Sequence, residues 1–271
     1  MRTPFSKFAF AFLAGLLLAA NGAAAATLRV AGTGGVLEAI QQVASPFAAA
    51  TGIELEVITG LGTAGAMRAL PDGVIDAVFA AREPNPNEAK VQLVSRSFAR
   101  TPLVFVTSHR KPNGLKSSDI PAIFASQSPK WEDGTPLKII LRTKVDADTV
   151  ITGQAIPGLA EAIERARARA DVPVAATDQD NVNIAQRLEG SFTFAGYGQI
   201  IAEKCDLRLV PIDGVMPSLA ALANGTYPYE KKFYLVFAPE RSAGAEQLLQ
   251  FLRSAEGRKI LLAIGYLPLG D

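Results

Sequence analysis

The chain has 271 residues, which is enough for one large domain or two lobes with a sizeable core. Its 27 basic and 26 acidic side chains are nearly balanced, so the net charge gives no reason to expect binding to nucleic acid or to an anionic membrane surface. The one cysteine, Cys205, excludes an internal disulfide, so the core alone must stabilise the fold.

The first 26 residues have the pattern of a cleaved signal peptide. Arg2 and Lys7 give a positive start, and an uninterrupted apolar run follows at residues 8–20. This run is too short to be a good membrane span, which argues against an uncleaved anchor, and no later segment is apolar for long enough to span a bilayer. Alanines at 24–26 provide the small residues of a cleavage site, and no cysteine follows for a lipid anchor. We therefore expect export to the periplasm and a mature chain that begins near residue 27.

Strands and helices alternate in the first part of the mature chain. Residues 28–31 predict a short strand, which leads into the glycine-rich loop 32–35. Residues 36–50 carry apolar side chains at helical spacing, and Gly52 stands where helices commonly end. The next predicted elements are a strand at 53–58, a short helix at 63–70 and a buried strand at 74–80. This βαβαβ order predicts a mostly parallel sheet covered by helices.

A second α/β unit is predicted between two strands that cross from one lobe to the other. The crossing strands are the β-prone runs at 102–108 and 232–238. The elements between them are a helix capped by Ser118-Asp119 that ends at 124, a strand at 137–141, a helix at 158–170, a strand at 172–175, a capped helix at 178–188 and a strand at 191–195. Two terminal helices, at 248–252 and 260–264, are expected to fold back on the first unit.

The segment that returns the chain to the first unit carries the most informative pattern. An Asp-Gly pair at 213–214 and an Asn-Gly pair at 224–225 predict two turns, because glycine accepts positive φ at no steric cost. Between them, Pro217 suits the first turn of a short helix, where its missing N–H costs nothing. An apolar strand follows. This order resembles the return segment of periplasmic phosphate-binding proteins, the solute receptors of phosphate ABC transporters.

The resemblance covers essentially the whole mature chain, and short motifs carry it in order. They are the glycine-rich loops 32–35 and 60–65, the loop 76–84, Ile123-Phe124 with the Trp-Glu-Asp-Gly run at 131–134, Arg142 at the end of a strand, Glu256-Gly257 and the Gly-Tyr-Leu-Pro run at 265–268. The resemblance implies an α/β, two-lobed periplasmic binding protein of type II with two crossover strands. Lobe one is expected at 27–105 with 232–271, and lobe two at 106–231.

The resemblance also implies which residues bind a ligand. They are Thr33, Gly34, Gly35, Thr63, Ala64, Arg82, Arg142 and Thr149. A glycine-rich turn that enters a helix presents free N–H groups at the positive end of the helix dipole. Threonine hydroxyls add donors, and an arginine offers a bidentate fork to a tetrahedral oxyanion. The alternative is that both loops are tight turns needed only for packing.

Three features depart from the phosphate sites of that family. Residues 79–82 read Phe-Ala-Ala-Arg, where the family has a serine and an aspartate. Only Thr149 remains of the Ser-Gly-Thr that follows the family's arginine. Asp146 and Asp148 stand where an anion would have to lie, and an unpaired carboxylate there would repel it. Either these aspartates cap the next helix, or the pocket accepts a ligand with a cationic part.

The orientation of Arg82 stays open. Its side chain either points into the cleft and adds positive charge there, or pairs with Glu83 or Glu88 on the rim. A pair on the rim would contribute little. Only the first orientation makes Arg82 a ligand residue.

The inventory of side chains argues against catalysis. His109 is the only histidine, and its place in a Ser-His-Arg-Lys-Pro turn indicates a solvated loop residue rather than a base. A metal site lacks the histidines and thiols it would need, and neither a dinucleotide fingerprint nor a phosphate-loop lysine is present. We therefore expect a binding protein that uses no cofactor, and not an enzyme.

Together these features predict a periplasmic solute-binding protein that captures a small oxyanion, phosphate before others, by hinge closure of its lobes. The resemblance implies delivery to an ABC permease in the inner membrane, and we expect a monomer that binds no nucleic acid. Three alternatives stay open. They are a receptor for a different small molecule, a ligand-free accessory of a membrane sensor or complex, and a hydrolase built on this fold.

Overall fold

The computed structural model describes residues 26–88 and 92–270. The predicted signal peptide lies outside the described residues, apart from Ala26, so its cleavage stays a prediction. Within the described ranges, no helix combines the length and the apolar character needed to cross a bilayer.

A mixed sheet runs through the molecule. The strands are β1 (Ala26–Gly32), β2 (Ile53–Ile58), β3 (Ala77–Ala80), β4 (Val94–Thr107), β5 (Lys138–Ile139), β6 (Leu141–Arg142), β7 (Val174–Ala175), β8 (Ser191–Gly196), β9 (Arg208–Leu209), β10 (Glu230–Phe237) and β11 (Leu267–Pro268). Among the described residues, the main sheet has the order β2-β1-β3-β10-β4-β8-β5, with β9 and β11 also on β4, and β6 pairs with β7 apart from it. Strands β1, β2 and β3 are parallel, whereas β10 is antiparallel to both β3 and β4.

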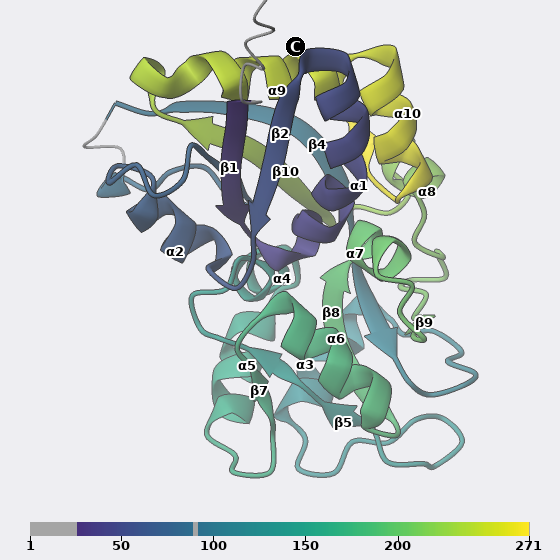
Figure 1. Ribbon diagram of the computed structural model, residues 1–271. Helices are drawn as coiled ribbons and strands as arrows, with labels where there is room; N and C mark the ends of the chain where they lie inside the picture. Colours follow the sequence, from purple (N-terminus) through teal and green to yellow (C-terminus); the bar gives the residue numbers. More distant parts are fainter. Residues whose placement is uncertain (1–25, 89–91, 271) are drawn as a thin grey trace, which may run out of the picture.

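Helices cover the sheet in two lobes. They are α1 (Gly34–Thr51), α2 (Gly62–Ala69), α3 (Ile120–Ala125), α4 (Ala147–Ala155), α5 (Leu159–Arg167), α6 (Asp178–Arg187), α7 (Tyr197–Ala202), α8 (Leu219–Ala223), α9 (Ser242–Arg253) and α10 (Ala255–Ala263). Figure 1 shows α1, α2, α9 and α10 around β1, β2 and β10 in the upper lobe, and α3, α5 and α6 around β5, β7 and β8 in the lower lobe. The terminal helices therefore fold back on the first lobe, as predicted.

Strand β4 passes from one lobe to the other. Its residues 94–102 pair with β10, and residues 103–106 pair with β8. The predicted crossing strand at 102–108 missed the first half of β4, because polar side chains interrupt the apolar run there. The second crossing strand was predicted at 232–238, close to the observed β10. The lobe boundaries at 105/106 and 231/232 stay predictions.

The predicted apolar stripe of α1 is confirmed. Val36, Ala39, Ile40, Val43 and Phe47 are fully buried in one core with side chains of β1, β10 and the terminal helices. A separate core forms in the lower lobe between β8, α3 and α5. Each lobe therefore has its own apolar interior, and Ala202 of α7 and Ala147 of α4 join the core of the first lobe from the second.

The predicted strand at 137–141 is two short strands, because the chain changes partner at Ile140. Ile139 pairs with β8, whereas Leu141 pairs with β7. Both partners are parallel to the chain. The switch places Arg142 at the end of β6, away from the main sheet.

The two predicted helix starts in the lower lobe have different outcomes. Asp119 stands at the N-cap of α3 but makes no capping hydrogen bond, because the chain enters α3 through the 3₁₀ turn Ser117–Asp119. The start of α6 is capped as predicted. The Thr177 hydroxyl accepts from the Asp180 N–H at 3.0 Å, and the Asp180 carboxylate accepts from the Thr177 N–H at 3.1 Å.

Gly32 holds the loop before α1 against β3. Its φ is 154°, and a Cβ at this position would lie 1.9 Å from the carbonyl oxygen of Phe79. Thr33, the next residue, donates its backbone N–H to the same oxygen at 2.9 Å. A side chain at position 32 would therefore push the start of α1 away from the sheet.

We expect Gly32→Ala to lower the free energy of unfolding by about 3 kcal/mol or more, because backbone strain and the clash with Phe79 act together. The control is Gly52→Ala, where φ is 73° and nothing lies within 4 Å of the added Cβ. That variant should lose only about 1 kcal/mol from strain. Urea unfolding followed by circular dichroism measures both losses, and equal losses would contradict the clash.

Candidate functional site

A cavity of about 180 Å³ lies between the two lobes. Lobe one lines it with the loop residues 33–34, the segment 60–64 and Arg82. Lobe two lines it with residues 142–143, 145–147 and 176–179. These segments are the starts of α1, α2, α4 and α6, so the N-termini of four helices approach one space. Such an arrangement favours negative charge in the space between them.

The guanidinium of Arg142 is the most buried charge that lines this cavity, with 2% of the residue exposed. Its Nη2 lies 2.6 Å from Oδ2 of Asp146 and 3.5 Å from Oδ1 of Asp178. Burial alone would lower the pKa of Arg142, but the nearby carboxylates raise it above its ordinary value. Among the described residues, no protein acceptor receives a hydrogen bond from its Nε or Nη1. Arg142 therefore stays charged and keeps donors free.

The two aspartates after Arg142 have different roles. Asp146 is the N-cap of α4, and its Oδ1 accepts from the backbone N–H groups of Asp148 at 3.0 Å and Thr149 at 3.4 Å. Capping is thus correct for Asp146. Asp148 instead turns inward, and its Oδ1 lies 2.5 Å from Nζ of Lys231. Burial raises the pKa of Asp148 to about 6, against the pull of Lys231 in the opposite direction.

Asp178, the first residue of α6, reaches across to the other lobe. Its Oδ2 accepts from the Thr33 hydroxyl at 3.1 Å, and its carboxylate faces Gly35. Its Oδ1 lies 3.7 Å from Nζ of Lys231, in addition to the contact with Arg142. Burial alone would raise the pKa of Asp178, but the two cations and the donors of the loop before α1 lower it. The carboxylate is therefore ionised at the start of α1.

Five charged side chains thus gather at the wall of the cavity and behind it. They are Arg142, Lys231, Asp146, Asp148 and Asp178. Three carboxylates against two cations give the cluster one net negative charge when all are ionised. Burial strengthens both the attraction and the repulsion among these charges, because the local dielectric constant is low.

The structure brings most of the predicted ligand residues together. Thr33, Gly34, Thr63, Ala64, Arg82 and Arg142 line the cavity. Gly35 lies behind it and faces Asp178. Thr149 is buried on α4, and its hydroxyl has no hydrogen-bond partner among the described residues.

Two of these residues are already engaged by other groups. The hydroxyl of Thr63 accepts from the backbone N–H of Ala81 at 3.2 Å. The guanidinium of Arg82 makes two hydrogen bonds to Glu88, at 2.7 and 2.8 Å, and one to the carbonyl of Glu83. The rim orientation of Arg82 is therefore the observed one, so Arg82 brings little free charge to the cavity.

Sequence reasoning missed Lys231 and the role of Asp178. Lys231 stands just before the predicted strand at 232–238, at a position where a lysine commonly faces solvent, and Asp178 was read only as part of a capped helix. The neighbour Gln179 also crosses between the lobes, since its Nε2 donates to the Gly34 carbonyl at 3.2 Å. One signal could have indicated a separate role for Asp178. Thr177 already provides the N-cap of α6, so the helix does not need Asp178 as a cap.

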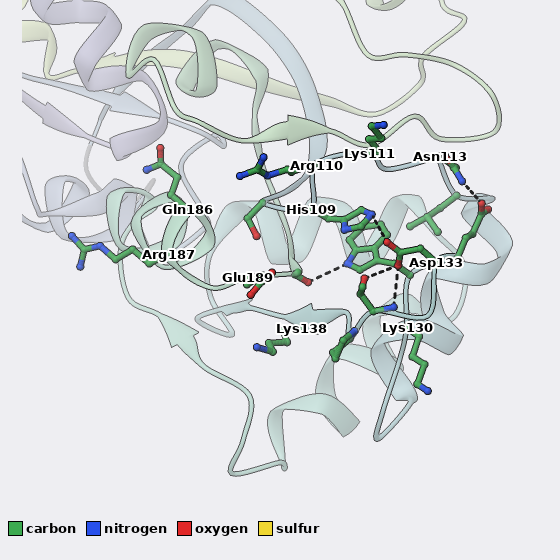
Figure 2. A pocket seen from close by; sticks show the side chains of 18 residues that line it. His109, Arg110, Lys111, Asn113, Lys130, Asp133, Lys138, Gln186, Arg187 and Glu189 are labelled. Carbon is green, nitrogen blue, oxygen red and sulfur yellow. Dashed lines mark hydrogen bonds and ion pairs between the residues drawn. The ribbon is translucent and has the colours of Figure 1, made fainter.

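A larger hollow of about 990 Å³ lies wholly in lobe two and is lined by residues from 108 to 190 (Figure 2). There the His109 ring stacks on Trp131 with centroids 5.0 Å apart, and its Nε2 lies 3.6 Å from Oδ2 of Asp133. The expectation of a solvated histidine is wrong, because this stacking leaves only 17% of the side chain exposed. Trp131 is fixed in turn by a hydrogen bond from its Nε1 to the Gly190 carbonyl.

Metal binding finds no support in the part of the chain that the structure describes. No group of three or more histidine, cysteine, aspartate or glutamate side chains there has an arrangement that could hold a metal ion. The buried carboxylates of the interlobe cluster are paired with Arg142 and Lys231 instead.

Comparison with known proteins identifies the fold. The family model of the PBP superfamily domain matches residues 19–256, and no curated protein sequence matches the chain.

Among solved structures, a phosphate ABC transporter substrate-binding protein with bound phosphate from Clostridium perfringens is 15% identical, with a TM-score of 0.77 over 90% of this chain and 100% of that chain. An ABC-type phosphate transport receptor from Vibrio cholerae is 14% identical, with a TM-score of 0.63 over 89% of this chain and 99% of that chain. The periplasmic molybdate-binding protein of Azotobacter vinelandii is 16% identical, with a TM-score of 0.62 over 90% of this chain and 100% of that chain. The predicted two-lobed α/β fold is confirmed.

We expect Lys231→Met to destabilise the protein in a pH-dependent way. Loss of the ammonium leaves Asp148 and Asp178 buried without their main partner, which costs about 3–5 kcal/mol when both are ionised. Their folded-state pKa values then rise, and a carboxyl whose pKa is raised by folding loses stability as pH rises. The loss should therefore be larger at pH 8 than at pH 5. The control is Lys232→Met, whose side chain is 49% exposed and should change little.

Chemical unfolding of both variants at the two pH values measures this difference. A penalty for Lys231→Met that is the same at pH 5 and pH 8 would show that the buried carboxylates do not depend on Lys231.

Proposed function

Because the chain belongs to the PBP superfamily, we propose that it is a periplasmic solute-binding protein that captures a small oxyanion between its two lobes. Phosphate is the first candidate. The neighbouring structures support this choice of chemistry, since they include proteins described as receptors for phosphate and for molybdate, both tetrahedral oxyanions.

The observation that carries the proposal is the state of Arg142. Its guanidinium lines the interlobe cavity, is buried, and has two nitrogens that no protein acceptor within the described residues engages. Buried donors without acceptors are unfavourable, so a site of this kind is stabilised by a guest that accepts from them. An oxyanion can accept charge-assisted hydrogen bonds from these donors.

Lobe one supports the proposal from the opposite side. The first turns of α1 and α2 line the same cavity as Arg142, at Gly34 and at residues 62–64. N–H groups in the first turn of a helix lack intrahelical partners and carry partial positive charge. An anion held between Arg142 and these turns would contact both lobes and favour their closure.

The wider role follows from the superfamily and the N-terminal sequence. The predicted signal peptide would export the chain, and the closed, loaded form would deliver its ligand to an ABC permease in the inner membrane. In this role the protein acts as a monomer that binds and releases, and it uses neither a catalytic residue nor a cofactor.

A second candidate is a ligand that carries a cationic group beside its anionic one. The excess of one carboxylate in the buried cluster favours it, because a bare dianion would meet net negative charge behind the cavity. An α-amino acid has the two groups that such a site would pair.

Calorimetric titration with phosphate, sulfate, molybdate and glycine tests the two candidates. We expect the wild-type protein to bind phosphate, and Arg142→Lys to weaken this binding at least about tenfold, because lysine cannot form the bidentate fork. The control is Arg165→Lys, on the exposed side of α5.

Binding of glycine alone would favour the second candidate. No binding of any of the three oxyanions would contradict the proposed function, and an undiminished affinity in Arg142→Lys would remove Arg142 from the site.

A further inference from the structure

We infer that the carboxylate of Asp178 acts as an anion that belongs to the protein itself, which we call the tethered anion. In the ligand-free protein it accepts from donors of lobe one and so joins the two lobes. It determines specificity because it competes with a bound oxyanion. This inference rests on the proposed function, since it concerns the same cleft. It names a specificity-determining residue that the sequence resemblance does not include.

The carboxylate has the surroundings of a bound anion. It accepts from the hydroxyl of Thr33 at 3.1 Å and faces Gly35, both in lobe one. It also lies 3.5 Å from the guanidinium of Arg142 and 3.7 Å from the ammonium of Lys231. One hydroxyl donor and two positive charges converge on one carboxylate whose side chain is 7% exposed.

Local structure does not explain this position. The cap of α6 is complete without Asp178, because Thr177 and Asp180 form a capping box. By contrast, α1 lacks a local anion: its 18 residues begin at Gly34, its N-cap Thr33 makes no side-chain capping bond, and its first turn has no acidic residue. Asp178 therefore serves the start of α1, although it stands 145 residues from Thr33 in the chain.

A neighbouring contact holds the same loop. Gln179 donates from Nε2 to the carbonyl of Gly34 at 3.2 Å, so two consecutive residues of α6 contact the loop before α1. A Cβ on Gly34 would lie 2.3 Å from Oε1 of Gln179, which shows how closely the lobes approach. These contacts close the cleft at the inner side of the cavity.

Arg142 keeps hydrogen-bond donors that the carboxylate of Asp178 does not use. Its Nη2 faces Asp146 and Asp178, while the buried Nε and Nη1 engage no protein acceptor in the described part of the chain. An incoming oxyanion would use these remaining donors and the start of α2, next to a carboxylate that already holds the start of α1. Repulsion between the two negative charges would then weaken binding. Removing the charge of Asp178 should strengthen it.

The experiment compares wild-type protein with Asp178→Asn, which keeps the shape and removes the charge. Sodium phosphate and sodium sulfate are titrated by calorimetry, and small-angle X-ray scattering measures the radius of gyration with and without phosphate. We expect Asp178→Asn to bind both anions at least tenfold more tightly than wild type. Without anions it should have a larger radius of gyration, which phosphate reverses.

Glu161→Gln is the matched control, because it also removes one negative charge from lobe two, at an exposed position on α5 that does not line the cavity. It should behave as wild type in both measurements. Should Asp178→Asn fail to fold, Gln179→Ala tests the joining of the lobes without removing a charge, and its radius of gyration without anions should also increase.

The possible results separate this inference from the proposed function. If wild type binds phosphate as tightly as Asp178→Asn does, or more tightly, the tethered anion is wrong while the proposed function stands. If neither protein binds an oxyanion, the proposed function is wrong, and the scattering data alone test whether Asp178 joins the lobes. An unchanged radius of gyration in Asp178→Asn would show that Asp178 does not join them, and an increase would support the inference that it does.

Discussion

The closed form of this protein depends on a buried carboxylate at the start of a long helix. The first turn of α1 presents N–H groups that neither its N-cap nor an acidic side chain of its own satisfies. Asp178 on α6, in the other lobe, accepts from the hydroxyl of Thr33, the N-cap residue of α1. One contact therefore places a negative charge at the start of α1 and joins the two lobes, and opening the cleft must replace it with water or with another anion.

Lys231 connects this contact to the strands that cross between the lobes. It lies on β10, next to β4, and its ammonium lies 2.5 Å from Asp148 on α4 and 3.7 Å from Asp178 on α6. A rotation of lobe two about the crossing strands would move both carboxylates relative to Lys231. Because the three groups are buried, their pairing is sensitive to small displacements. The cluster would thus couple such a rotation to the carboxylates beside the cavity.

The features that could be predicted from the sequence are local ones. The apolar stripe of α1, the glycine-rich loops, and the N-cap role of Asp146 each follow from residues within a few positions of one another. Asp148 shows the limit, since it is two residues from Asp146 and pairs with Lys231 instead of a helix end. No spacing rule indicates that pairing, or the contact of Asp178 with a loop 145 residues away. Such contacts depend on how the lobes meet, which periodicity and turn residues do not encode.

The chemistry between the lobes bears on whether this protein is a receptor or a permanently closed accessory. Buried ion pairs are weak sources of stability, and apolar side chains of similar volume often hold two surfaces together as well or better. A protein that only needed closed lobes would gain from such a replacement. Charged groups differ because water solvates them again when the lobes separate, which reduces the free energy needed for opening. An interlobe contact built from the charged Asp178 and the polar Thr33, with part of the nearby Arg142 guanidinium left free, therefore fits a cleft that opens and admits an anion better than one that stays shut.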